Sequence, residues 1–412
     1  MALLTLAVGL IAKSSGVNWR AETQPLFILF DPVWSGWGLL ALATVLLGLF
    51  LAFMLWRSRL RVGWFAFALF GLTLFTRLGL NLGRHGPSDW YEIFSFEPGT
   101  ILGFEYLSAL PYLDGGMNRF LDDFAGLVQE LPVHVAGHPP GMMVMIDWLG
   151  INSAEGLAAV TIVVGALATP LLYFLARSLF DETTARVAGL LFVFVPTSLL
   201  YGVTSADALF VTLGLAAALC LLSRQRWVVV LGAFLLTLAS FFSYALLAAG
   251  GWAGLVRWRR DGFRSMAGAA LACAAVLVAF YGLLFAFTGF DVLGAISATS
   301  DRYHDGIANV RPLYFWLFGS PAAFILMLGP VAWFAARSLA SREITALALT
   351  AIIVFTSILG YTKAETERIW FFLVPFACLA AARALPGRGV KPVLVLLAIQ
   401  AFAIEILFAT RW

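Results

Sequence analysis

Residues 35–56 have the sequence SGWGLLALATVLLGLFLAFMLW, and this stretch decides the class of the protein. A helix needs about 20 apolar residues to cross the hydrocarbon core of a bilayer, and this stretch reaches that length without a charge. Similar runs recur along nearly the whole chain of 412 residues, of which 61% are hydrophobic and only 12% charged. Soluble domains are about one quarter charged. The sequence therefore predicts an all-α, polytopic integral membrane protein whose residues 1–412 form a single transmembrane domain.

Apolar length and spacing predict about twelve membrane spans, separated by short breaks that carry arginine. The expected spans are residues 35–56, 62–81, 155–178, 187–203, 205–223, 227–242, 244–257, 266–288, 312–336, 343–361, 368–384 and 391–410. The N-terminal residues 1–11 are apolar but short, and they lack the basic leader of a cleaved signal peptide. We expect them to lie at the membrane interface or to form a thirteenth span.

Charge is divided unequally between the two sets of predicted loops. One set carries most of the arginines and only four acids, which are Asp181, Glu182, Asp261 and Glu343. Since Lys and Arg accumulate on the cytoplasmic side, this set is expected in the cytoplasm and the acid-rich set outside it. The overall net charge of +3 conceals this polarity. Such basic loops indicate topology and contact with membrane lipid, and we expect no nucleic-acid partner.

The longest interruption of the apolar pattern runs from residue 81 to residue 154. It is rich in acidic, aromatic and histidine residues, and it contains the segment Gly137-His138-Pro139-Pro140-Gly141. Apolar spacing predicts amphipathic interfacial helices at 104–110 and 118–130. The two prolines interrupt the helix before a short segment at 142–150. We expect this loop to lie outside the cytoplasm as the roof of an active site.

Three shorter loops are expected on the same face. The turn at 196–207 places Asp207 at the mouth of the following span. The loop at 291–311 contains Arg302 and His304, and the loop at 360–368 contains Lys363, Glu365, Glu367 and Arg368. Chemistry is therefore expected at this face of the membrane.

The first-loop acid Glu105, an interfacial helix and the His138-Pro139-Pro140-Gly141 segment together resemble the GT-C superfamily of membrane glycosyltransferases. The likeness is closest to the protein O-mannosyltransferase and aminoarabinose-transferase type. The hairpin at 196–210, with Pro-Thr-Ser and Ser-Ala-Asp-Ala-Leu-Phe, and the segment Glu365-Thr366-Glu367-Arg368-Ile369-Trp370 are similar too. Two features depart from that pattern. The relatives often have an Asp-Glu pair where this chain has a lone Glu, and they commonly have one span before the loop where two are predicted here.

The resemblance implies an enzyme of the cytoplasmic membrane, with its active site on the extracytoplasmic side. Basic residues that are almost all arginine, together with abundant Ala and Gly, indicate a bacterial source. The implied enzyme transfers a sugar, with inversion, from a polyprenyl-phosphate carrier to a hydroxyl acceptor on a glycolipid, a cell-wall glycan or a protein. The attacking hydroxyl must lose its proton, and a carboxylate within hydrogen-bond reach can act as general base. Glu105 is the first candidate for this base, Asp114 the second, and Asp89 a further alternative.

The leaving lipid phosphate gains negative charge and needs fixed cations or donors. The candidates on the outer face are Arg368, Arg302, Lys363 and His138. The substrate pocket is expected to include Tyr106, Asp207, Glu365, Glu367 and His304. A divalent ion such as Mg²⁺ or Mn²⁺, held by carboxylate oxygens, is compatible with this chemistry.

Each candidate can also have a purely structural role. Glu105 can belong to the solvated face of an interfacial helix, His138 can cap a helix, and Asp207 can cap the next span. The group around Arg368 can be a local ion pair on a loop. The sequence shows no evident partner for His134, which is expected at the surface. Asp122-Asp123 is expected to be a solvated charge run, because adjacent helical residues point about 100° apart.

The competing hypothesis is a transporter or flippase of a lipid-linked or small polar solute. Such proteins usually show internal repeats, interrupted helices and ionisable groups near the middle of the membrane. This chain has no visible repeat, and apart from Glu405 its acids gather at the ends of predicted spans. That distribution favours chemistry at one surface over translocation.

Overall fold

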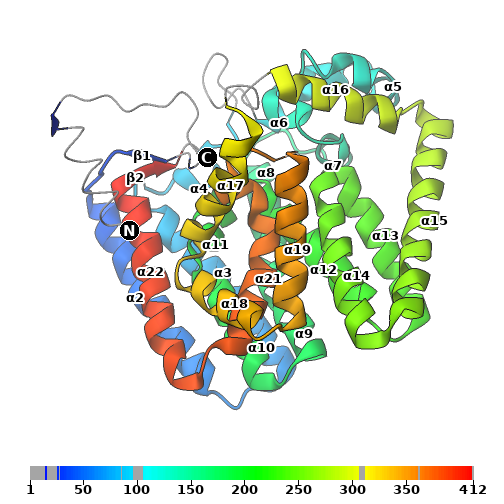
Figure 1. Ribbon diagram of the computed structural model, residues 1–412. Coiled ribbons are helices and arrows are strands. Elements are labelled where there is room, and N and C mark those ends of the chain that lie inside the picture. The colour runs from blue at the N-terminus through cyan, green and yellow to red at the C-terminus, as the bar shows by residue number, and fades with distance from the viewer. Residues whose placement is uncertain are drawn as a thin grey trace.

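The computed structural model describes residues 14–15, 26, 28–84, 86–95, 105–305, 311–360 and 362–410. These residues form a bundle of mostly upright helices with shorter helices across one end (Figure 1). The predicted N-terminal element at 1–11 lies outside the described residues. The expected all-α membrane protein is confirmed at this coarse level.

Five helical segments in the described part of the chain are long and apolar enough to cross a membrane. They are α2 (Gly36–Arg57), α3 (Val62–Asn81), α8 (Ala154–Ala166) with α9 (Ala168–Leu179), α15 (Phe263–Thr288) and α22 (Val390–Leu407). Two bent helix pairs raise this number to as many as seven. Shorter helices fill the bundle: α12 (Asp207–Leu221), α13 (Arg226–Phe242), α14 (Leu247–Asp261), α19 (Ile344–Leu359) and α21 (Val374–Ala384). The larger number of twelve or thirteen spans stays a prediction.

Two of the predicted straight spans are broken helices. The span expected at 187–203 is α10 (Glu182–Phe194) followed by α11 (Pro196–Thr204), with a bend of 57°. The span expected at 312–336 is α17 (Leu313–Leu328) followed by α18 (Pro330–Ala340), with a bend of 111°. Each second helix starts with proline, and the residue before proline is disfavoured in the helical conformation. Val195 is accordingly extended, and Gly329 has a φ of 55°.

Small residues let the first two long helices approach closely. Ser35 caps α2 by accepting a hydrogen bond from the backbone N–H of Gly38. A Cβ atom on Gly79 would lie 1.9 Å from the Thr44 side chain, and one on Gly48 would lie 2.5 Å from Thr76. Lipid tails are as apolar as the helix surfaces, so the hydrophobic effect does not drive helices together within a bilayer. Helices associate there by close packing, which small residues at the contact allow. Helix α3 also packs against α9 and α11.

Short helices gather at one end of the bundle, which is the upper end in Figure 1. They are α4 (Asp89–Glu92), the 3-10 helix η2 (Tyr106–Leu113), α5 (Met117–Leu127), α6 (Val133–Ala136), α7 (Gly141–Leu149) and α16 (Val292–Asp305). Helix α16 packs against α5. The expected segments at 104–110, 118–130 and 142–150 fall on η2, α5 and α7, and their position at a membrane interface stays a prediction.

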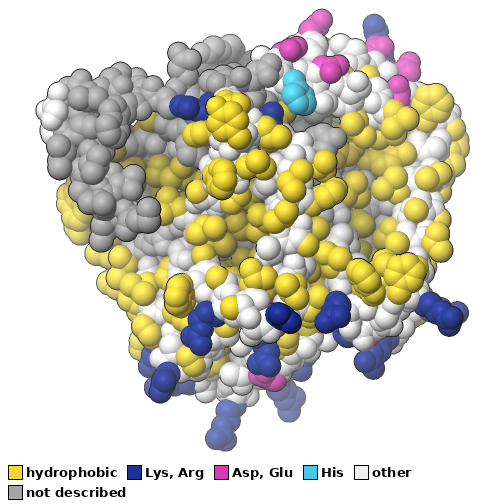
Figure 2. All heavy atoms as spheres, viewed as in Figure 1, with side chains coloured by type: hydrophobic (Ala, Val, Ile, Leu, Met, Phe, Trp, Pro, Cys, Tyr) yellow, Lys and Arg dark blue, Asp and Glu magenta, His cyan; other side chains and the backbone are white. Residues whose placement is uncertain are grey.

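Two loop segments complete this end. Strand β1 (Ile28–Phe30) pairs antiparallel with β2 (Phe408–Thr410), so the predicted last span ends at Leu407. Helix α20 (Thr366–Ile369) and the 3-10 helix η5 (Trp370–Leu373) lead into α21. Figure 2 shows Lys and Arg gathered mainly at the lower end and Asp and Glu mainly at the upper end. The membrane and the orientation of the chain in it stay predictions.

Candidate functional site

Glu105 and His134 form a buried pair at the end of the bundle where the short helices lie. Glu105 directly precedes η2, and its Oε1 atom lies 2.7 Å from the Nδ1 atom of His134 in α6. Less than a tenth of either side chain is exposed. The expectation that His134 is a surface residue is therefore wrong. A carboxylate 29 positions away in the chain compensates the burial of the imidazole, and no local sequence pattern reveals that pairing.

Arg368 is held between two carboxylates from different segments. Its Nη2 atom donates to Glu365 Oε2 at 2.8 Å, and its Nη1 atom lies 3.4 Å from Asp207 Oδ2. About a tenth of the Arg368 side chain is exposed. The same oxygen of Asp207 accepts a hydrogen bond from the Ser205 hydroxyl at 2.6 Å. Asp207 therefore faces Arg368 from the first turn of α12, and α20 supplies the guanidinium.

Two further side chains, Tyr106 and His138 of the segment between α4 and α7, share the electrostatic field of these groups. Burial raises the pKa of Tyr106 well above its usual value, the carboxylates of Glu105 and Asp207 raise it further, and Arg368 opposes them. Burial lowers the pKa of His138 to about 4, although Asp207 and Glu105 act in the opposite direction. The imidazole of His138 also packs edge-on against Phe210, with 5.2 Å between the ring centres.

These observations bring six of the polar side chains into one site, which we call the acid–arginine cluster. Its members are Glu105, His134, His138, Asp207, Glu365 and Arg368. They come from four regions of the chain, namely the start of η2, the α6–α7 segment, the start of α12 and the α20 turn. Five of the six were candidates on the sequence alone, and His134 is the addition.

The backbone at Glu365 is strained. Its φ of 58° is left-handed, a conformation that residues with a side chain rarely adopt. Such a backbone costs on the order of 1 kcal/mol or more and persists only where surrounding contacts fix it. Here the Glu365 carbonyl accepts hydrogen bonds from the backbone N–H groups of Arg368 and Ile369, and the Glu365 carboxylate forms the ion pair with Arg368. Strained residues of this kind concentrate at functional sites.

The other sequence-predicted residues make different contacts. Asp114 is exposed just after η2, and His304 is exposed on α16, where it bonds to Ser300. Arg302 donates to the Val128 carbonyl, which ties α16 to the end of α5. The backbone N–H of Lys363 donates to the Tyr303 hydroxyl at 2.6 Å. Glu367, which precedes Arg368 in the chain, is fully buried.

Arg77 is a buried cation that sequence reasoning passed over. It lies in α3, is completely buried, and donates from Nη2 to the Ser198 hydroxyl at 2.7 Å. The rings of Phe192 and Phe371 lie 5.8 and 5.9 Å from its guanidinium carbon. A signal was present, because an ionisable residue inside an apolar run is expensive in lipid and marks a specific role. Arg77 thus fixes the broken helix α10–α11 to α3.

A pocket of about 420 Å³ adjoins the first-loop helices. Its walls come from α4, η2 and the start of α8, and its polar lining includes Tyr91, Ser108, Asn152 and Glu155. Leu107 and Ser108 follow Glu105 by two and three positions. The pocket combines an aromatic ring with hydroxyl, amide and carboxylate groups, which suits a small polar ligand.

The donors of the site do not fit a divalent metal ion well. No three His, Cys, Asp or Glu side chains of the described residues converge closely enough to hold one. The carboxylates that do gather face the guanidinium of Arg368 or the imidazole of His134. A role for Mg²⁺ or Mn²⁺ stays a sequence prediction, and no step below depends on a metal.

Comparison with protein-family models, with curated proteins and with solved structures finds no match for this chain. The residues of the site themselves define the chemistry that it can perform. They offer a carboxylate–imidazole pair that can accept a proton and a guanidinium that can bind an anion. Both lie at one end of a membrane-embedded bundle.

Proposed function

We propose that this protein is an inverting glycosyltransferase of the GT-C type. It moves a sugar from a polyprenyl-phosphate carrier to a hydroxyl acceptor at the outer face of the cytoplasmic membrane. The observation that carries this proposal is the acid–arginine cluster, in which Glu105, Asp207 and Arg368 converge although they are far apart in the chain. A lipid-linked donor reaches such a site from the bilayer, and the acceptor hydroxyl reaches it from the loop side.

Glu105 is the general base of the proposed reaction. The acceptor oxygen forms a bond to the anomeric carbon, its proton passes to the Glu105 carboxylate, and the bond from that carbon to the phosphate oxygen breaks. The electron pair of the broken bond leaves with the polyprenyl phosphate. His134, at 2.7 Å from Glu105, holds the carboxylate in place and stabilises its charge before the proton arrives. General-base catalysis of this kind contributes about 10²- to 10⁴-fold.

Arg368 is the proposed ligand of the leaving phosphate. Because two carboxylates already share its guanidinium, the phosphate takes the place of one of them. Glu365 is the partner that moves, since its strained backbone relaxes when the ion pair opens. Asp207 stays with Arg368 because the Ser205 hydroxyl also holds it. This exchange makes donor binding at Arg368 dependent on Glu365.

The pocket beside η2 is the proposed entrance for the acceptor. Its hydroxyl, amide and carboxylate groups match the hydroxyl groups of a polyol or sugar, and the Tyr91 ring supplies a flat apolar face. It lies next to the segment that carries Glu105. The donor sugar and the identity of the acceptor are left to experiment.

The direct test supplies purified protein in lipid with a panel of polyprenyl-phosphate sugars and a mixture of hydroxyl acceptors. Release of polyprenyl phosphate from at least one donor is expected for the wild type. Glu105→Gln should reduce that release by at least 100-fold. If the wild type neither binds nor consumes any donor, the transferase proposal fails. If Glu105→Gln keeps full activity, the assignment of the base fails and the transferase proposal survives.

One observation favours the alternative of a transporter or flippase. The helix pairs α10–α11 and α17–α18 are bent by 57° and 111°, and interrupted helices are frequent in transporters. In such proteins the ligand binds at the break. Liposomes that contain the protein and a fluorescent polyprenyl-phosphate sugar in one leaflet distinguish the two functions. A transporter equilibrates the donor between leaflets without cleaving it, whereas the proposed transferase releases polyprenyl phosphate.

A further inference from the structure

A second polar region lies at the other end of the bundle, where the α12–α13 turn meets the α14–α15 turn. Six arginines and a single acid, Asp261, give this region a net charge of +5. The arginines are Arg224, Arg226, Arg257, Arg259, Arg260 and Arg264. We call this group the arginine turn. The proposed transferase reaction does not use it.

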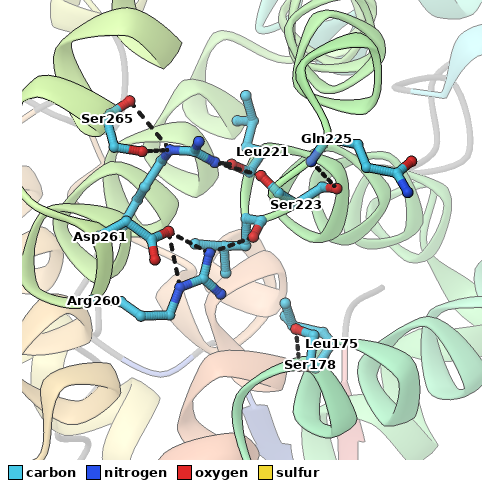
Figure 3. A network of polar contacts seen from close by, with 10 residues as sticks. Leu175, Ser178, Leu221, Ser223, Gln225, Arg260, Asp261 and Ser265 are labelled. Carbon is cyan, nitrogen blue, oxygen red and sulfur yellow. Dashed lines mark hydrogen bonds and ion pairs between the residues drawn. The ribbon is translucent and has the colours of Figure 1, made fainter.

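Two of these arginines hold the end of α12. Arg257 donates through Nη1 to the carbonyls of Leu221 and Ser223, at 2.6 and 2.8 Å. Arg260 donates to the Leu222 carbonyl and to Asp261 (Figure 3). The last carbonyls of a helix have no partner within the helix, so these guanidinium groups cap it. The two turns are thereby fixed against each other.

The other four arginines, Arg224, Arg226, Arg259 and Arg264, are exposed around this fixed centre. Positive side chains at a membrane surface attract anionic lipid, and the attraction adds up over neighbouring residues. The exposed aromatic rings of Trp258 and Phe263 lie beside them, with 6.3 Å between the ring centres. Aromatic residues of this kind are typical of the boundary between hydrocarbon and headgroups.

An apolar groove of about 330 Å³ starts at the arginine turn. Its walls come from α12, α13, α14 and α15, and Arg257 and Trp258 line its end nearest the turns. The lined part of α14, from Leu247 to Trp258, extends roughly 16 Å at 1.5 Å per residue. Gly254 leaves the groove open, because an added Cβ there would meet only the Met266 side chain, at 3.9 Å. The groove is large enough for a stretch of acyl chain.

We propose that the groove and the arginine turn together bind one anionic phospholipid of the surrounding bilayer. The phosphate lies against the exposed guanidinium groups of Arg224 and Arg264, and one acyl chain lies along α14. The net positive charge selects an anionic headgroup over a zwitterionic one. Because the acyl chain lies in the groove, the lipid binds at one defined position and is not merely attracted to a charged surface. This site is independent of the transferase reaction at the other end of the bundle.

The first test measures how much the exposed arginines contribute to lipid binding. Purified protein in detergent is titrated with phosphatidylglycerol or phosphatidylcholine, and bound lipid is counted by native mass spectrometry. The double variant Arg224→Gln, Arg264→Gln should bind phosphatidylglycerol roughly 30-fold more weakly, which corresponds to about 2 kcal/mol. The matched control is Arg57→Gln, Arg59→Gln, two exposed arginines at the C-terminal end of α2. This control should bind as the wild type does.

The second test fills the groove. Gly254→Leu should remove the tightest phosphatidylglycerol, while Gly268→Leu should leave it in place, because an added Cβ at Gly268 meets nothing within 4 Å and lies outside the groove. Thermal melting checks that both variants fold. If the Arg57, Arg59 control loses as much phosphatidylglycerol binding as the Arg224, Arg264 variant, the binding reflects a diffuse surface potential and the proposal is overturned. Wild-type binding by a folded Gly254→Leu protein would overturn it as well.

Discussion

The two ends of the bundle use arginine in different ways. At the arginine turn, Arg257 and Arg260 bond to the last carbonyls of a neighbouring helix, which a folded chain needs in any case. At the acid–arginine cluster, Arg368 instead bonds to two carboxylates, one of them on the distant helix α12. Burying several charges is expensive even when they are paired, and folding alone does not require it. The contacts of the arginine turn are therefore accounted for by folding alone. The buried charges of the acid–arginine cluster indicate a functional role.

The largest expected difference between the two ends is in turnover. Glu105→Gln removes the proposed proton acceptor while it keeps the size of the side chain, so release of polyprenyl phosphate should fall by about 10²- to 10⁴-fold. Asp261→Asn, the matched change at the arginine turn, should stay within about twofold of the wild type because no reacting group lies there. Equal losses in the two variants would mean that the ends do not differ in function.

The next effect is on stability. Arg368→Gln leaves Asp207 and Glu365 buried without their cation and should lower the free energy of unfolding by about 3 to 5 kcal/mol. Arg177→Gln breaks a more exposed pair with Glu182 and should cost less than about 1 kcal/mol. Chemical denaturation in detergent measures both. A double variant with Glu365→Gln should recover part of the loss, and additive losses would contradict the shared ion pair.

At the acid–arginine cluster, stability is expected to depend on pH through His138. Burial lowers the pKa of His138 from 6.5 to about 4, so the folded protein holds this imidazole neutral. The unfolded chain binds the proton first, and His138 therefore contributes stability that is complete above about pH 6.5. That contribution should be lost as the pH falls from 6.5 to 4. Thermal melts over this range should be less pH-dependent for His138→Gln than for the wild type, and identical slopes would rule out this titration.

The smallest effect compares Glu365 and Arg342, the two non-glycine residues with a positive φ in the described part of the chain. Both have a φ of 58°, and glycine adopts this conformation without steric cost. Arg342→Gly should therefore raise the free energy of unfolding by about 0.5 to 1 kcal/mol. Glu365→Gly should lower it, since the ion pair to Arg368 is lost together with the strain. Stabilisation in both variants would show that the Glu365 carboxylate contributes little.

The coarse fold was accessible from the sequence because apolar runs as long as α2 and α15 are typical of membrane spans and rare in soluble domains. The breaks at Pro196 and Pro330 were less accessible. Proline marked each of them, but composition across a break is as apolar as within a span. The candidate site was also predictable only in part. Glu105, Asp207 and Arg368 were identifiable by their chemistry, whereas their convergence depends on long-range packing. His134 was missed because its only distinguishing feature is its partner.

The most direct test of the central claim is a sided turnover measurement. Proteoliposomes are prepared, the orientation of the protein is determined, and polyprenyl-phosphate sugar is supplied in one leaflet at a time. We expect polyprenyl phosphate to be released from the leaflet that faces the acid–arginine cluster, and that release to be lost in Glu105→Gln. Movement of intact donor between leaflets without release from either would contradict this account and favour a transporter.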